Sequence, residues 1–258
     1  MPVGWVWLPA TALFSLPVAD TRSALSSVTL RWDDQFRVDA TLGADFPLVE
    51  AQLGAHRLDF GIEASGAMGF QPAGELTFQL ETFDGTFGFP VAVRHGPWSV
   101  RAELAHTSAH FADGVRDDGA LPASSDGYSR EWFRLLGSRE IGPARVYAGG
   151  RALIHDQRGA EPLGVQAGAE VFGPWKLAPF AAVDLQIAAE SDWAPAVSGQ
   201  VGGALNLRGA RRLRIAMAGR YGPEDTGKLT GAHEAWLGVT FGFDSTGWIG
   251  PNSGAQDP

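Results

Sequence analysis

Residues 234–243 read EAWLGVTFGF, and every second residue of this stretch is apolar. Successive side chains of an extended chain point to opposite faces, so one face carries Ala235, Leu237, Val239, Phe241 and Phe243. The opposite face combines glycine with polar and aromatic residues. This period of two predicts a β-strand whose apolar face has to be shielded from water.

The same alternation recurs along the chain, most clearly within residues 38–46, 57–64, 165–171, 181–187 and 212–220. Turn-forming residues separate such stretches and divide the chain into about twelve strands. The expected spans are 27–33, 36–48, 55–66, 76–93, 97–111, 128–138, 144–155, 163–172, 178–190, 197–207, 211–221 and 232–243. A slip in the alternation predicts a bulge or loop near Asp84 and Gly85.

Two architectures could shield so many apolar faces: the core of a soluble β-sandwich, or lipid around a transmembrane barrel. The strands approach the ~9–11 residues that a tilted spanning strand needs, and their second face mixes glycine with charges of both signs. Aromatic residues near strand ends resemble interfacial girdles; they are Trp32, Phe46, Phe89, Trp98, Trp175 and Trp193. Because only a closed sheet pairs all its backbone groups in lipid, we predict an all-β fold, a closed antiparallel transmembrane β-barrel of about twelve strands.

Composition excludes several other classes of protein. The chain has 34 glycines among 258 residues, which disfavours a helix-rich enzyme. It has no cysteine, and therefore neither a disulfide framework nor a thiolate metal site. Its formal net charge of −9 argues against nucleic acid as a partner.

The chain divides into three segments. Residues 1–25 form a lead-in segment, of which residues 3–19 are uncharged like a signal-peptide core. No basic residue precedes that run and two prolines interrupt it, so the segment is either a signal remnant or part of the mature chain. Residues 26–243 form the barrel, and residues 244–258 form a flexible tail rich in Gly, Pro, Asp and Ser. The longest polar connection, residues 113–127, is expected to be an extracellular loop.

Particular stretches resemble known outer-membrane proteins. LGVTFGF at residues 237–243 resembles the signal by which such barrels are recognised, which implies the barrel assembly machinery as a partner through the strand ending at Phe243. Residues 8–243 resemble an uncharacterised family of bacterial outer-membrane barrels. The matching stretches include residues 8–9, 16–22, 46–48, 106–110, 134–136, 146–150, 181–185 and 206–221. This resemblance implies a location in the bacterial outer membrane, contact with its lipid bilayer, and no known activity.

A narrower resemblance concerns one hairpin. His106-Thr107-Ser108, followed by a polar connection and by SREWFRL at residues 129–135, is similar to the active-site hairpin of outer-membrane phospholipase A. That family consists of twelve-stranded barrels with a His-x-Ser pair on one strand and an Asn on the next. The resemblance implies that His106 is a general base and Ser108 a nucleophile toward a lipid ester. At the position of the Asn this chain has Phe133, which cannot accept the imidazole N–H.

The alternation predicts, independently, that this pair faces lipid. His106 and Ser108 continue the outward apolar set that begins at Trp98, with about 7 Å between them along the strand. Glu131 shares the outward parity of Phe133 and is a third candidate catalytic residue. The alternative is that His106 and Ser108 form a polar collar at the membrane interface without a catalytic role.

No cofactor is predicted apart from calcium as an option. Carboxylate and hydroxyl oxygens are the ligands that calcium prefers. The polar connection offers Asp113, Asp117, Asp118, Ser124 and Asp126, without a defined ligand spacing.

Three functions remain open: a structural barrel with a plugged polar lumen, a lipid acyl-ester hydrolase, and a small-solute channel. About twelve strands enclose a narrow bore, which charged side chains on the inner face would largely fill. These side chains include Arg57, Asp59, Glu63, Arg101, Glu103, Arg151, Glu170 and Asp184. We predict the structural barrel, because the missing Asn weighs more than the His-x-Ser pair that is present.

Overall fold

The structure, a computed structural model, describes residues 4–75, 77–112, 128–207, 211–224 and 233–244. These residues form thirteen β-strands and one short 3-10 helix, η2 (Ala189–Ser191). The strands are β1 (Gly4–Trp7), β2 (Ser26–Trp32), β3 (Phe36–Leu53), β4 (His56–Pro72), β5 (Phe78–His95), β6 (Trp98–Phe111), β7 (Tyr128–Ile141), β8 (Ala144–Asp156), β9 (Leu163–Phe172), β10 (Leu177–Ala188), β11 (Pro195–Asn206), β12 (Arg212–Pro223) and β13 (His233–Asp244). None of the described helical segments has the length and apolar character needed to cross a bilayer.

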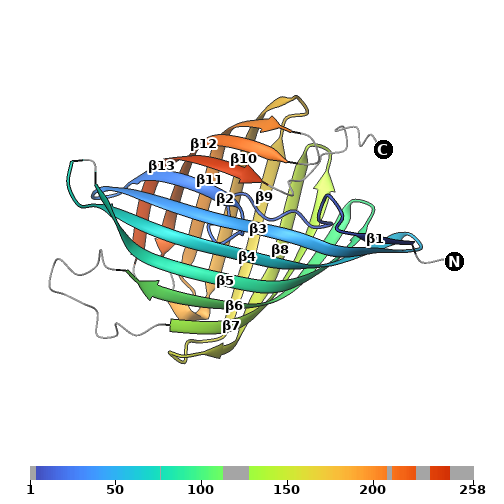
Figure 1. Cartoon of the computed structure of the whole chain (residues 1–258), viewed down its shortest axis with the longest axis horizontal. Helices are drawn as coiled ribbons and strands as arrows, with labels where there is room; N and C mark the ends of the chain where they lie inside the picture. Colours follow the sequence, from blue (N-terminus) through green and yellow to red (C-terminus); the bar gives the residue numbers. More distant parts are fainter. Residues whose placement is uncertain (1–3, 76, 113–127, 208–210, 225–232, 245–258) are drawn as a thin grey trace.

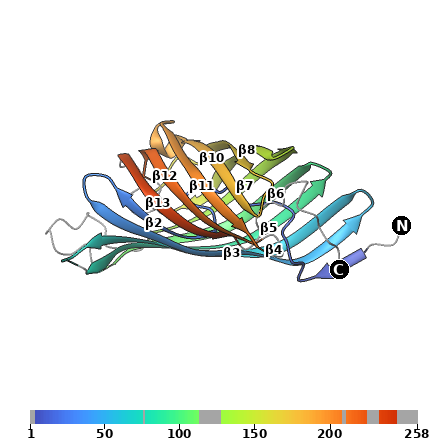
Figure 2. The same cartoon turned by 90° about the horizontal axis from the view of Figure 1, so that it is seen from above.

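Strands β2 to β13 form a closed antiparallel barrel of twelve strands (Figures 1 and 2). Each strand pairs with the next along the chain, and β13 pairs with β2 to close the sheet. Strand β1 lies outside this ring and pairs with the end of β3, where Trp7 faces Val49. The predicted fold class is therefore confirmed.

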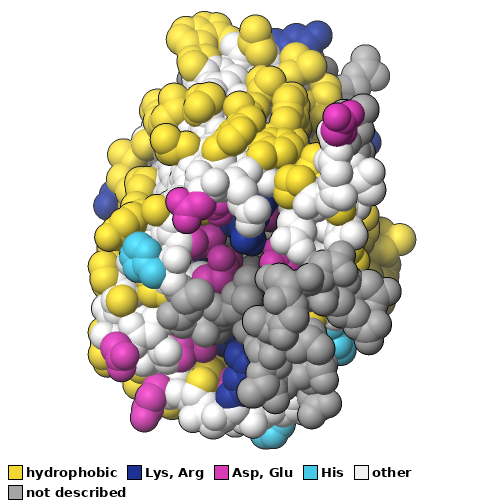
Figure 3. All heavy atoms as spheres, turned by 90° about the vertical axis from the view of Figure 1, so that its left-hand side faces the viewer, with side chains coloured by type: hydrophobic (Ala, Val, Ile, Leu, Met, Phe, Trp, Pro, Cys, Tyr) yellow, Lys and Arg dark blue, Asp and Glu magenta, His cyan; other side chains and the backbone are white. Residues whose placement is uncertain are grey.

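The two faces of the sheet differ as the alternation predicts. In β13, Leu237 and Phe241 are 69% and 48% exposed on the outer surface, whereas Thr240 between them is 1% exposed. The aromatic residues predicted near strand ends are all exposed: Trp32, Phe46, Phe89, Trp98, Trp175 and Trp193. Figure 3 looks onto one end of the barrel, where hydrophobic side chains cover the outer wall and charged side chains lie in the hollow.

The two ends of the barrel are connected differently. At one end, two-residue turns join β3 to β4, β5 to β6 and β7 to β8, and each begins with a glycine at positive φ: Gly54, Gly96 and Gly142. Only glycine adopts this conformation without strain, which allows the tight turn. Longer connections, such as residues 157–162 and 189–194, lie at the opposite end. The predicted extracellular loop, residues 113–127, lies outside the described residues.

The irregularity predicted near Asp84 and Gly85 lies three residues earlier. Gly69 pairs with Thr82 and Phe70 pairs with Leu80, so Glu81 is the extra residue of a bulge in β5. The bulge reverses the in–out parity, and the carboxylate of Glu81 pairs with Arg37 at 3.1 Å.

Residues 11–25, which we call the plug, run through the inside of the barrel between β1 and β2 (Figure 1). The side chains of Leu16, Val18 and Ala24 are nearly inaccessible to solvent and pack in one cluster with inward side chains such as Phe172 and Phe180. The lead-in segment that we predicted as separate from the barrel thus contributes to its core. Two prolines and several small residues give it no regular period, which is why the alternation did not indicate this packing.

Side chains of the barrel wall bind the peptide groups of the plug. The N–H of Leu13 donates to Asp59 at 2.7 Å, and the N–H of Val18 donates to Glu170 at 2.5 Å. Arg145 donates to the carbonyl oxygens of Ser15 and Leu16. These bonds satisfy buried backbone groups that have no strand partner.

The barrel extends one residue beyond its predicted boundary at 243. Asp244 is the last residue of β13, is 1% exposed, and pairs with Arg214 at 2.8 Å. The rest of the predicted flexible tail, residues 245–258, lies outside the described residues.

Two adjacent glycines in β11 predict opposite responses to alanine. A Cβ at Gly202 would lie 2.1 Å from the carbonyl oxygen of Ile215, whereas a Cβ at Gly203 would meet no atom within 4 Å. We expect Gly202→Ala to lower the free energy of unfolding by about 1–3 kcal/mol and Gly203→Ala, the matched control, to change it by less than about 0.5 kcal/mol. Urea unfolding in detergent micelles, followed by tryptophan fluorescence, measures both. Equal stability of the two variants would contradict the close inter-strand approach.

Candidate functional site

The outer wall carries a cluster of polar side chains near the end with the long connections. Strand β6 turns His106 outward, and β7 turns Glu131 outward directly opposite, because these two residues are register partners. Their side chains are 48% and 39% exposed. Ser108 lies opposite Ser129 in the same pair of strands. The three predicted site residues therefore lie on one face of two neighbouring strands.

Glu131 contacts two imidazole rings. Its Oε1 lies 2.7 Å from Nδ1 of His106, and its Oε2 lies 2.8 Å from Nδ1 of His155. An ionised carboxylate only accepts hydrogen bonds, so both Nδ1 atoms are donors. In a neutral imidazole this leaves Nε2 as the proton acceptor, which is the tautomer a general base requires.

A bulge in β8 brings His155 to this cluster. Glu131 pairs with His155 and Trp132 pairs with Leu153, so Ile154 is the extra residue. Both Ile154 and His155 are exposed in consequence, and parity inverts beyond them. From its place near a strand end the sequence predicts only a surface or turn position for His155, and strict alternation would turn it inward, so no pattern places it beside Glu131.

Two features of a complete catalytic triad differ here. Phe133 lies opposite Leu104 rather than opposite His106, so Glu131 occupies the position from which an acceptor can orient the imidazole. Among the hydrogen bonds of the described residues, none joins Ser108 to His106. The arrangement provides an oriented base near the half-buried hydroxyl of Ser108 on the outer wall.

The residues considered as calcium ligands belong to the longest polar connection. Asp113, Asp117, Asp118, Ser124 and Asp126 lie outside the described residues. Within the described ranges, no group of three or more His, Asp or Glu side chains has a geometry that could hold a metal ion.

The inner face contains a buried network of ion pairs. Arg101 contacts Asp45 at 2.7 Å and Glu63 at 2.6 Å, and its side chain is 3% exposed. Arg134 joins Glu103 to Asp20 of the plug, at 2.9 and 3.2 Å. The charged residues predicted to fill the lumen thus lie on the inner face. The plug adds one further carboxylate, that of Asp20, which the sequence analysis did not place inside the barrel.

A second cluster of charges lies inside the barrel, near the end with the long connections. Glu190 of η2 accepts hydrogen bonds from Arg130 of β7, at 2.9 Å, and from Arg151 of β8. Burial alone would raise the pKa of the Glu190 carboxyl, but the guanidinium groups of Arg151, Arg22 and Arg130 more than offset this and hold the pKa below its ordinary value.

Glu190→Gln is expected to destabilise the barrel by about 3 kcal/mol at neutral pH, because it leaves buried guanidinium groups without this counter-charge. A depressed pKa contributes stability above the unfolded value of about 4.3, and this contribution is lost as the pH falls below it. The difference in the free energy of unfolding between wild type and variant should therefore become smaller as the pH falls. Urea unfolding at neutral and acidic pH in detergent measures the difference.

Asp33→Asn is the matched control, because Asp33 belongs to a more exposed pair with Arg37 at 3.9 Å. This substitution should change stability by less than about 0.5 kcal/mol. If the difference in the free energy of unfolding between wild type and Glu190→Gln stays constant with pH, ionisation of the Glu190 carboxylate is not the cause of the destabilisation.

Two of the solved structures that match the chain are outer-membrane phospholipases. Outer membrane phospholipase A from Escherichia coli superposes with a TM-score of 0.53 and 13% sequence identity, over 90% of this chain and 99% of that chain. The outer membrane phospholipase of Salmonella typhi, a dimer with bound calcium, gives a TM-score of 0.52 and 13% identity, over 88% of this chain and 94% of that chain. At this identity the likeness establishes the fold alone.

A family model described as a protein of unknown function (DUF1207) matches residues 3–243, so the chain belongs to this family. This agrees with the predicted resemblance to an uncharacterised barrel family. Comparison with the curated proteins finds no match to the chain.

Proposed function

We propose that this member of the DUF1207 family is an outer-membrane β-barrel whose lumen is closed by its own plug. An apolar outer wall around a charged interior is the arrangement of a barrel that spans a bilayer. The shared architecture with outer membrane phospholipase A favours the outer membrane as its location. The two-residue turns then face the periplasm and the long connections face outward.

The plug is the observation that carries this proposal. Its backbone bonds to opposite parts of the wall: Leu13 to Asp59 of β4, Val18 to Glu170 of β9, and Ala19 to Ser198 of β11 at 2.6 Å. A segment held from several sides leaves little space for solutes, which favours a structural barrel over a channel. The strand ending at Phe243 is the segment that we propose the barrel assembly machinery recognises.

Liposome swelling tests the closed lumen. Vesicles that contain the wild-type protein should admit small sugars no faster than protein-free vesicles. Removal of residues 1–24 should accelerate the entry, because it empties the lumen. Asp20→Ala combined with Arg145→Ala, which removes two contacts of the plug and keeps its length, should have the same effect to a smaller degree.

Arg57→Ala is the matched control, because Arg57 pairs with Glu50 near the two-residue turns and its side chain is 43% exposed. It should leave the vesicles closed. Rapid sugar entry through the wild-type protein would overturn the proposal, and so would folded plug variants that stay closed.

A second candidate function, hydrolysis of lipid esters on the outer wall, is favoured by the hydrogen bond between His106 and Glu131. In this reaction Nε2 of His106 accepts the hydroxyl proton of Ser108 while Oγ attacks the ester carbonyl carbon. The protonated imidazole then donates to the departing alcohol, which leaves Ser108 acylated. Water activated by His106 releases the fatty acid and restores the serine. Glu131 is the positioning residue that holds His106 in the required tautomer.

Phospholipid hydrolysis by the protein in detergent, with and without calcium, tests this candidate. Ser108→Ala should abolish hydrolysis, and Glu131→Leu should lower the rate by about 10²-fold because His106 loses its acceptor. Glu131→Gln should retain more activity than Glu131→Leu, since the amide oxygen still accepts the Nδ1 proton. His110→Ala, on the same face of β6, is the control. Activity that survives Ser108→Ala, or its absence from the wild type in both conditions, would remove the candidate.

A further inference from the structure

Strand β1 lies outside the ring of twelve strands, at the end of the barrel beside the β3–β4 hairpin (Figure 1), but in line with β2. Because β4 pairs with β3 along residues 38–53, β1 must use the same edge of β3 as β2 does. On that edge β2 pairs with residues 36–41 and β1 with residues 49–52. The chain leaves this edge after Leu8, which has a positive φ of 51°, and then forms the plug. The plug is therefore an insertion between two strands that follow one edge of β3.

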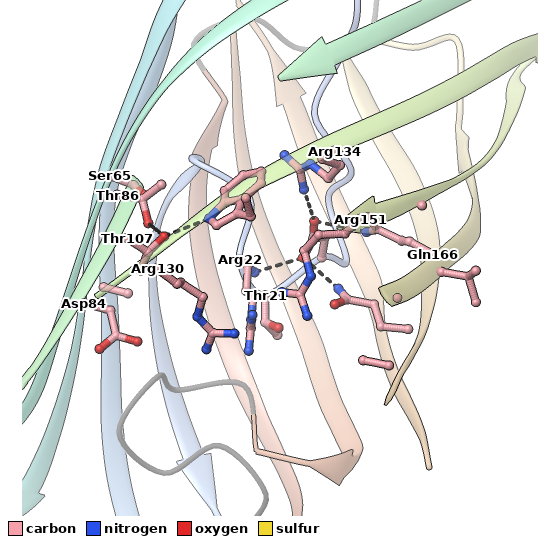
Figure 4. A pocket seen from close by; sticks show the side chains of 18 of the residues that line it. Thr21, Arg22, Ser65, Asp84, Thr86, Thr107, Arg130, Arg134, Arg151 and Gln166 are labelled. Carbon is pink, nitrogen blue, oxygen red and sulfur yellow. Dashed lines mark hydrogen bonds and ion pairs between the residues drawn. The ribbon is translucent and has the colours of Figure 1, made fainter. Parts of the chain in front are cut away.

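The two ends of the plug are held differently. Near β2, Asp20 accepts hydrogen bonds from Arg134 at 3.2 Å and from Gln166 at 3.1 Å. Figure 4 shows Thr21 and Arg22 among side chains of the surrounding wall. The other end continues into β1, a strand of four residues that pairs with β3. So short a strand with one partner is a weak attachment by itself, and contacts on its outer side would strengthen it.

The outer face of β1 carries two exposed tryptophans, Trp5 and Trp7, which are 62% and 76% exposed. Directly opposite residues of neighbouring strands share a face of the sheet. The row that starts at Trp5 continues with outer residues of the wall: Ala51, Leu58, Val93 and Val100. The row that starts at Val6 continues with buried inner residues: Glu50, Asp59, Ala92 and Arg101. The two indoles therefore extend the apolar outer wall.

The outer surface changes from apolar to polar next to Trp5. Two residues nearer the turns, the corresponding positions of β4 and β5 hold His56 and His95, which are exposed and whose ring centroids lie 4.6 Å apart. Trp5 thus lies between the apolar residues of the wall and a pair of imidazoles. Such a boundary at the end of a transmembrane barrel marks the level of the lipid headgroups.

The backbone of β1 argues for the same level. Among the described residues β1 pairs with β3 alone, so its second edge presents N–H and C=O groups that have no strand partner. Hydrocarbon offers no partner to these groups, and bulk water would leave two large apolar rings exposed. The headgroup level provides hydrogen-bonding partners for the edge and an apolar layer for the rings. It is also where tryptophan is enriched in membrane proteins.

We propose that the outer face of β1 is a lipid-binding surface, on which Trp5 and Trp7 insert among the phospholipid headgroups at the end with the two-residue turns. This inference rests on the proposed transmembrane barrel and gives a role to the strand outside the ring. By holding β1 against β3, the bilayer fixes one end of the plug, while the hydrogen bonds of Asp20 fix the other end inside the barrel.

Fluorescence quenching by brominated phospholipids tests the proposal with the full chain in phosphatidylcholine vesicles. The chain has nine tryptophans, so the emission of the pair is taken as the difference between wild type and the double variant Trp5→Phe, Trp7→Phe. Bromine near the headgroup end of the acyl chain should remove most of this emission. Bromine near the methyl end should remove less, because rings at the headgroup level do not reach it. If the double variant does not fold, Trp7→Phe alone gives the same comparison for the more exposed ring.

Two other tryptophans are matched controls. Trp98→Phe isolates the emission of a ring on the outer wall, 52% exposed, which lipid should quench whether or not β1 binds lipid. Trp236→Phe isolates that of an inward ring, 9% exposed, which neither lipid should quench. Quenching of Trp98 without quenching of the β1 pair would overturn the inference and leave the proposed barrel intact. Absence of quenching for both would overturn the barrel as well.

Two further outcomes would also sink the inference. Stronger quenching of the pair by bromine near the methyl end would place β1 in the hydrocarbon. A pair shielded from lipid, together with a change from dimer to monomer in the double variant on sedimentation, would show that a second copy of the chain covers β1.

Discussion

A charge inside a narrow closed sheet needs a counter-charge within the same sheet, because water there is scarce and the outer wall is apolar. Arg101 of β6 illustrates the constraint: it pairs with carboxylates of β3 and β4, which lie three and two strands away around the wall. Such pairs tie together strands that share no backbone hydrogen bonds. Among the described residues, the inner face of the barrel is therefore cross-linked by buried ion pairs.

The same need for partners inside the barrel applies to the peptide groups of the plug. A segment without strand partners can enter a closed barrel only if side chains of the wall bind its N–H and C=O groups. Glu170 serves both purposes: it accepts the N–H of Val18 and pairs with Arg145, which in turn donates to the carbonyl of Leu16. The polar residues of the wall thus bind the plug and each other in one network. Apolar contacts with Phe172 and Phe180 complete the packing.

Local alternation was sufficient to predict the strands and their faces, because the side of the wall on which a residue such as Leu237 lies depends only on its neighbours. It placed His106, Ser108 and Glu131 together for the same reason. However, the in–out alternation of side chains holds only as far as the next bulge. The extra residue Ile154 reverses it and places His155 on the outer face. The position of the plug could not be predicted for a different reason. It depends on contacts with residues more than a hundred positions away, and no period in residues 11–25 encodes them.

The polar cluster on the outer wall and the charge cluster around Glu190 meet at two consecutive residues of β7. Arg130 points inward to Glu190, and Glu131 points outward to His106 and His155. The bulge at Ile154 is what allows both contacts, since Arg151 before it faces inward while His155 after it faces outward. A shift of β7 by one residue against β8 would exchange the two faces and break both clusters at once. One register between β7 and β8 therefore holds both clusters in place. Apolar surface surrounds the outer cluster, and the plug lies next to the inner one.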